Sequence, residues 1–157
     1  MGTSGKDTLI ENIVSAFKIK NISSIDPIKQ MALQYGWDGN KDQRGRFLLQ
    51  ELKRIWTNYN DLSGEYIQKE SLNFQNDDNE ILFVHIREIE NIREFRSFIK
   101  SISLQVYTLL VIRQDSNTWE NSSDRDIYNY NYDFIFNNDK PLKESIIDFN
   151  NFLTNLI

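Results

Sequence analysis

The sequence contains no cysteine, one histidine, two prolines and six glycines in 157 residues. Without cysteine, the chain forms neither a disulfide framework nor a zinc site built on thiolates. No uncharged apolar run approaches about eighteen residues, so the sequence predicts no membrane-spanning helix and no signal-like segment. We therefore expect a protein of the cytoplasm that has no membrane partner.

Basic residues are also fewer than acidic ones, because 18 lysines and arginines stand against 23 aspartates and glutamates, for a net charge of −5. This balance gives no general attraction to the phosphate backbone of a nucleic acid, so we expect no nucleic-acid partner. Any phosphate-binding site must be local. At 39% hydrophobic and 13% aromatic residues, the chain has enough apolar material for one domain over residues 1–157.

Helical and extended patterns alternate along the chain. Apolar residues at three- and four-residue spacing predict helices over 6–18, 27–35, 42–59, 64–73, 89–99 and 141–156. Short apolar runs predict strands near 17–23, 80–86, 106–112 and 132–136, the second and third of them covered on both faces. This order predicts a three-layer α/β domain in which helices flank a mainly parallel sheet. In such sheets, ligands bind at the carboxyl ends of the strands.

Residues 2–8 read Gly-Thr-Ser-Gly-Lys-Asp-Thr and lead directly into the first predicted helix. Small residues before a helix N-terminus form a phosphate cradle, because free amide N–H groups and the positive end of the helix dipole converge there. The alternative is that Ser4 and Gly5 only cap the helix and Lys6 is an exposed residue of its first turn. A full G-x-x-x-x-G-K-[ST] loop needs an earlier glycine and a preceding strand, and neither is present. We therefore expect the natural chain to have residues before Met1 or around the loop.

Four stretches together resemble the P-loop deoxynucleoside monophosphate kinases of phages and bacteria, a branch of the nucleoside monophosphate kinase-like fold. They are "GTSGKDT", "FKIKNISSIDPIKQMA", the pair "GRFLLQELKRIW" and "ILFVHIRE", and "SSDRDIYNYNYDFIFNNDKPLKESI". They occur in the order typical of the family and span nearly the whole chain. The resemblance implies a P-loop NTPase-type domain whose first strand is missing, with acceptor-binding helices at about 40–76 and a lid at about 114–130.

The resemblance also implies a reaction: the γ-phosphoryl group of ATP passes to a (deoxy)nucleoside monophosphate, with Mg²⁺ as cofactor. Small-molecule nucleotides are then the partners, and the enzyme is a monomer or homodimer. Phosphoryl transfer requires positioning and positive charge, so arginines that converge from separate elements are the feature to seek. The implied catalytic residues are Lys6, Arg87 and Arg125. The remaining implied contacts are with ATP (Gly2, Thr3, Ser4, Gly5, Lys6, Asp7, Thr8, Asn138), with the acceptor (Asp26, Arg44, Arg87) and with the metal (Asp7 or Thr8).

Plainer interpretations stand beside these assignments. Arg87 could form a surface pair with Glu90 or Glu94, Arg46 could replace Arg44, and Arg113 also qualifies by position. Asp26 and Asp139 could be helix caps, and Trp37 and Trp56 are expected in the core, whereas Trp119 lies in a polar loop. His85 stands where the family usually has an acidic residue, and a lone histidine there is more often structural than catalytic. Two other functions stay open: a degenerate P-loop module that binds without turnover, and a kinase for another small molecule.

Overall fold

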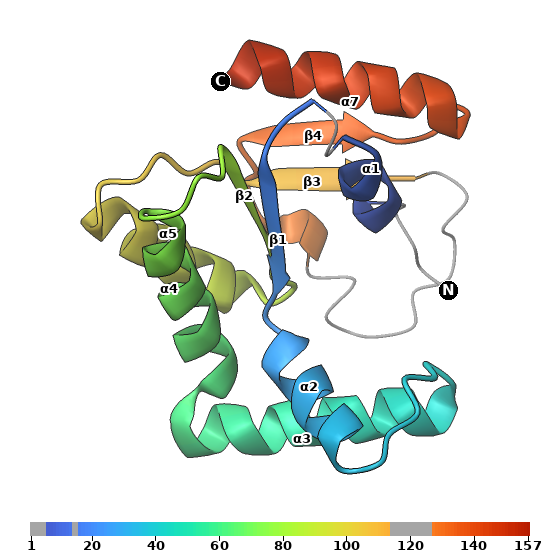
Figure 1. Ribbon diagram of the computed structural model, residues 1–157, viewed down its shortest axis with the longest axis vertical. Helices are drawn as coiled ribbons and strands as arrows, with labels where there is room; N and C mark the ends of the chain where they lie inside the picture. The colour runs from blue at the N-terminus through green and yellow to red at the C-terminus, as the bar shows by residue number, and fades with distance from the viewer. Residues whose placement is uncertain (1–5, 14–15, 114–126) are drawn as a thin grey trace.

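The computed structural model describes residues 6–13, 16–113 and 127–157 as a mixed α/β protein with two small parallel sheets (Figure 1). Its strands are β1 (Ile19–Ser23), β2 (Ile81–His85), β3 (Leu109–Ile112) and β4 (Phe134–Asn137). Its helices are α1 (Lys6–Ile13), α2 (Asp26–Gln34), α3 (Gln43–Asn60), α4 (Leu62–Phe74), α5 (Ile89–Ser101) and α7 (Leu142–Leu156), with a short 3₁₀ turn η1 (Ile127–Asn129). All four strands lie within or overlap the segments that the sequence predicts.

The strands form two pairs instead of one continuous sheet. β1 pairs in parallel with β2, where Ile19 lies opposite Ile81, and β3 pairs in parallel with β4, where Leu109 lies opposite Phe134. In the described part of the chain, β2 and β3 are not hydrogen-bonded to each other, and no strand precedes α1. β2 is covered on both faces, as expected, because Ile81 and Phe83 pack against one apolar cluster and Leu82 and Val84 against another, although all five of its residues keep some exposure. A strand with one paired edge has too few neighbours to be fully enclosed.

Two apolar clusters lie on opposite faces of these strands. On one face, α1 and α7 pack together, and Leu9, Ile13 and Phe149 are at most 1% exposed. The strand residues that contact this cluster include Ile19, Ile81, Phe83, Leu109, Val111 and Phe136. On the other face, Ile67 of α4 and Phe95 of α5 pack with Ile22, Leu82 and Val84. The two-residue periodicity of the strands therefore assigns odd and even positions to different clusters.

A third cluster joins α2 to α3 at the end of the molecule that is lowest in Figure 1. Ile28, Ala32 and Leu49 are buried there, and Trp37 and Trp56 pack against them, as the sequence predicts for both tryptophans. Because α3 packs on α2 and α4, it lies apart from the two sheets.

The helix ends differ from the sequence expectations at two places. The N-cap of α2 is Ile25, so Asp26 is not the cap; its carboxylate instead accepts a hydrogen bond from the amide of Ser23 at 2.7 Å. The N-cap of α7 is Pro141, so Asp139 does not cap that helix. α3 is capped by Asp42, whose carboxylate accepts from the amide of Gly45 at 2.8 Å. Among the described residues, no helix combines the length and apolarity needed to cross a membrane.

Candidate functional site

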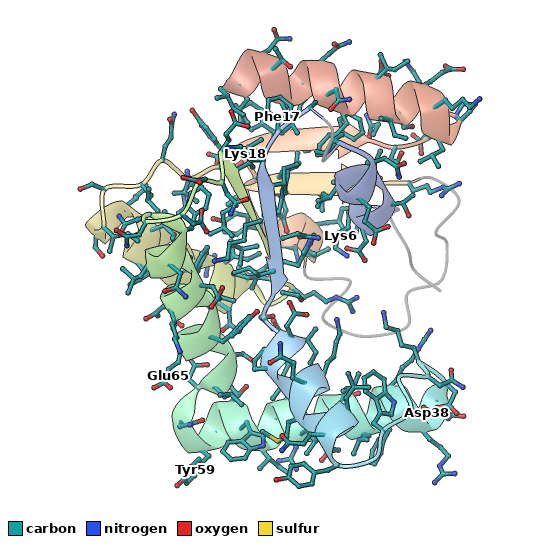
Figure 2. The ribbon with its side chains drawn as sticks, viewed as in Figure 1. Lys6, Phe17, Lys18, Asp38, Tyr59 and Glu65 are labelled. Atoms are coloured by element: carbon teal, nitrogen blue, oxygen red, sulfur yellow. The ribbon has the colours of Figure 1, made fainter. Side chains whose placement is uncertain are left out.

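The candidate site lies where α1 begins, at the carboxyl ends of β1 and β2. Asn21 and His85 occupy the same strand face as Ile19 and Phe83, because side chains two or four residues apart in a strand point the same way. That is the face covered by α1. In Figure 2 the labelled Lys6 lies between α1 and β1. The sequence therefore brings a cation, a carboxylate, an amide and an imidazole to one edge of the strands.

Three polar contacts connect these residues. Nε2 of His85 lies 2.7 Å from Oδ1 of Asn21 and 3.8 Å from Oδ1 of Asp7. The same Asp7 oxygen lies 3.4 Å from Nζ of Lys6. Because the two oxygens facing Nε2 are acceptors, the neutral ring carries its proton on Nε2 and leaves Nδ1 as an acceptor. Asp7 is thus shared between the lysine and the histidine.

Burial makes His85 a neutral residue. Its side chain is 17% exposed. Burial lowers the pKa of His85 to about 4, and the Lys6 ammonium adds to this effect, while the carboxylates of Asp7 and Asp26 oppose it. A group with so low a pKa is a weak base near neutral pH, so the geometry favours the structural interpretation of this histidine over a catalytic one.

Asp26 is engaged within its own turn. One carboxylate oxygen accepts from the amide of Ser23, and the other lies 3.3 Å from Nζ of Lys29. Both oxygens therefore have local partners at the end of β1, which hold the carboxylate in place. Lys29 brings a second ammonium group to this end of the strands, beside the one from Lys6.

The residues assigned to the metal fit Mg²⁺ in part. Among the described residues, no three His, Cys, Asp or Glu side chains are grouped so as to hold a metal ion. Mg²⁺ bound with a nucleotide keeps several waters and needs only one or two protein oxygens beside those of the phosphates. Asp7 has a side chain that is 65% exposed, and Thr8 is exposed in the same turn of α1, so either can supply such an oxygen.

The predicted arginines lie on separate elements. Arg87 follows β2 by two residues and is exposed, and Glu90, one of its two possible partners in the sequence, pairs with Arg93. Arg44 is exposed in the first turn of α3, without an ion pair to any described residue. The alternative to Arg44, Arg46, donates from Nε to the carbonyl of Lys41 at 3.0 Å.

Two further predicted positions follow the second strand pair. Arg113 is exposed directly after β3. Asn138 directly follows β4 and is 6% exposed. Its backbone N–H donates to the carbonyl of Ile112 at 2.7 Å. Both therefore lie at the carboxyl ends of their strands, as the sequence predicts. The ATP contacts Gly2, Thr3, Ser4 and Gly5, the lid arginine Arg125 and the loop residue Trp119 lie outside the described residues.

Sequence reasoning missed Asn21 and Lys29. The signal for Asn21 was a polar residue in a short apolar strand, but its role depends on the register that aligns β1 with β2. Lys29 follows Asp26 by three residues, a spacing that predicts an ion pair on a helix.

A separate shallow hollow of about 560 Å³ lies at the opposite, amino ends of β1 and β2. Its lining includes Phe17 and Lys18, which Figure 2 labels, and Glu80, whose carboxylate accepts from the amide of Lys18 at 2.8 Å. None of the predicted site residues lines it, so it does not belong to the candidate site.

No protein-family model matches this chain, and no curated protein matches its sequence.

Proposed function

We propose that the protein is a nucleotide kinase that transfers the γ-phosphoryl group of ATP to a (deoxy)nucleoside monophosphate. The observation that carries the proposal is the position of Lys6. Its ammonium group lies in the first turn of α1, at the carboxyl ends of two parallel strands, which is where phosphate ligands bind in α/β proteins.

The charges around Lys6 support an anionic ligand. A lysine in the first turn of a helix is unfavourable next to the positive end of the dipole, unless an anion lies nearby. Asp7 offsets part of that charge at 3.4 Å, and Asp26 and Lys29 offset each other. In our proposal Lys6 holds the β- and γ-phosphates, and the arginines after β2 and in α3 hold the acceptor phosphate.

Mg²⁺, held by Asp7 or Thr8, would neutralise charge on the phosphates. The other contributions to the site come from residues of the chain. Asn21 fixes the His85 ring through the 2.7 Å contact, and the neutral ring adds no positive charge that would compete with Lys6 for Asp7. The three-layer P-loop architecture is part of this proposal.

A coupled assay that follows ADP release tests the proposal. ATP and Mg²⁺ are supplied with a panel of ribo- and deoxynucleoside monophosphates and, separately, with unrelated small-molecule acceptors. We expect release that depends on a monophosphate, and a loss of several orders of magnitude in turnover for Lys6→Ala, with little change in folding. The control is Lys69→Ala, an exposed lysine of α4 outside the site. Equal turnover in both variants would exclude the proposed role of Lys6.

The second candidate is a P-loop module that binds a nucleotide without turnover. The observation that favours it is His85, whose neutral ring stands where the resembled family has a carboxylate. Binding of ATP with no release of ADP for any acceptor identifies this function. Turnover with an acceptor other than a nucleotide identifies the third possibility, a kinase for another small molecule on the same scaffold.

A further inference from the structure

A second small cavity lies on the other face of the β1 end, between α4 and α5. Its volume is about 20 Å³. Its lining contains Ser24, which directly follows β1, the first turn of α4 with Ser63 and Gly64, and Asn91, Glu94 and Phe95 of α5. None of the residues assigned to the nucleotide site lines it.

The lining of this cavity includes an unsatisfied hydroxyl group. Ser63 is 3% exposed, and its Oγ has no hydrogen-bond partner. A buried polar group without a partner is costly, so native structures pair such groups with protein, water or a ligand. Ser71 of the same helix shows the satisfied arrangement, because its buried Oγ donates to the carbonyl of Ile67 at 2.7 Å.

The rim of the cavity is acidic. Asp61 and Glu94 both line it and are exposed, and neither forms an ion pair with another described residue. The Asp61 carboxylate accepts only from the amide of Gly64, at 3.3 Å, among the described groups. Two carboxylates beside a hydroxyl group exclude an anion, although the cavity adjoins the N-terminus of α4.

We propose that this cavity binds one dehydrated monovalent cation of the potassium type. About 20 Å³ accommodates one particle the size of a water molecule. Hydrated Mg²⁺ is too large, since it keeps several of its waters. K⁺ gives up its hydration shell to protein oxygens, and here those come from Ser63, Asp61, Glu94 and the side-chain amides of Gln68 and Asn91. The cation binds to a lone pair of Ser63 Oγ and compensates the charge of both carboxylates, whereas a water molecule forms hydrogen bonds with the same groups and leaves both charges uncompensated.

Thermal unfolding of the full chain tests this site without any nucleotide. The melting temperature is compared in potassium, sodium and N-methylglucamine chloride at one ionic strength. We expect potassium to raise the melting temperature by roughly 2–4 °C over the organic cation, because a ligand that binds only the folded state stabilises it. Ser63→Ala and Glu94→Gln should lose this difference, and Ser71→Ala should keep it.

The outcomes separate the cation from its alternatives. Equal melting temperatures of the natural protein in all three salts would overturn the proposal and leave a water molecule as the occupant. A Ser63→Ala protein that is more stable than the natural one in potassium would show that no ligand binds the Ser63 hydroxyl, and this result would also overturn the proposal. If Ser63→Ala does not fold, Glu94→Gln decides, since Glu94 is exposed and its replacement keeps the shape of the side chain.

Discussion

Replacement of Asp133 by alanine should destabilise the second strand pair. One carboxylate oxygen of Asp133 accepts from the amide and the hydroxyl of Thr108, at 2.7 and 2.8 Å, and the other accepts from Nη2 of Arg96 at 2.8 Å. These contacts join the residues before β3 and β4 to α5. A hydrogen bond to a charged group contributes about 1.5–3 kcal/mol, and the three share one acceptor that is 27% exposed. We therefore expect a loss of about 2–4 kcal/mol in the free energy of unfolding, well below the sum of three separate bonds.

Urea unfolding and thermal melting measure this loss. At roughly 2–4 °C per kcal/mol for a chain of this size, the melting temperature of Asp133→Ala should fall by roughly 5–15 °C. The matched control is Asp148→Ala, which removes a carboxylate that lies 2.7 Å from Lys140 in a surface pair; both side chains are exposed, so little change is expected.

The effect of Asp133 should also depend on pH. Burial raises the pKa of Asp133, but the hydrogen bonds from Thr108 and Arg96 outweigh it, and the pKa lies below its ordinary value. The stabilisation is therefore complete above the unfolded-state pKa of about 3.9 and is lost as the pH falls through the folded-state pKa. The difference between natural protein and Asp133→Ala should shrink in acid. A deficit under about 0.5 kcal/mol at neutral pH, or one of equal size in strong acid, would refute the reasoning.

Two other predictions follow from single residues. The imidazole of His85, the only one in the chain, should titrate by NMR with a midpoint of about 4, and stability should fall between the unfolded-state pKa of about 6.5 and that value. A midpoint near the unfolded value would contradict the burial of the ring, and His85→Gln should flatten this pH dependence. In α3, Gly45→Ala should destabilise although alanine is the better helix former, because its Cβ would overlap the backbone carbonyl of Asn40 and lie 2.8 Å from Nε1 of Trp37. Urea unfolding against Gln50→Ala, an exposed position of the same helix, checks this, and equal stability of the two would contradict the overlap.

Helix and strand positions were predictable because they depend on local periodicity. The apolar spacing predicts α3 to within a residue or two at each end. The pairing of β2 was not predictable in the same way. Its run of apolar residues indicates a strand covered on both faces, which the two clusters confirm, but the number of paired edges depends on the tertiary arrangement, and in the described structure β2 is hydrogen-bonded only to β1.

The candidate site was predictable at Lys6 and only partly elsewhere. The Gly-Lys pair before an amphipathic helix predicts a cation at the start of α1, and alternating elements predict that this start meets the carboxyl ends of strands. The contact between His85 and Asn21 joins residues 64 positions apart and requires the register of two strands, which no local pattern contains. The same limit applies to Asp26, whose carboxylate the sequence offers as a contact with the acceptor or as a helix cap, and which instead accepts from the nearby amide of Ser23.

Asp61 has a mechanical consequence for the molecule. It is the C-cap of α3 and the N-cap of α4, with a left-handed backbone at φ 49°, so a single residue joins the two helices. With 18 residues, α3 is roughly 27 Å long. A turn of about 10° at this joint would move the far tip of α3 by roughly 5 Å. Because α2 packs against α3 through Ile28, Ala32 and Leu49, such a movement would carry α2 with it, and the short link between β1 and α2 would have to bend as well.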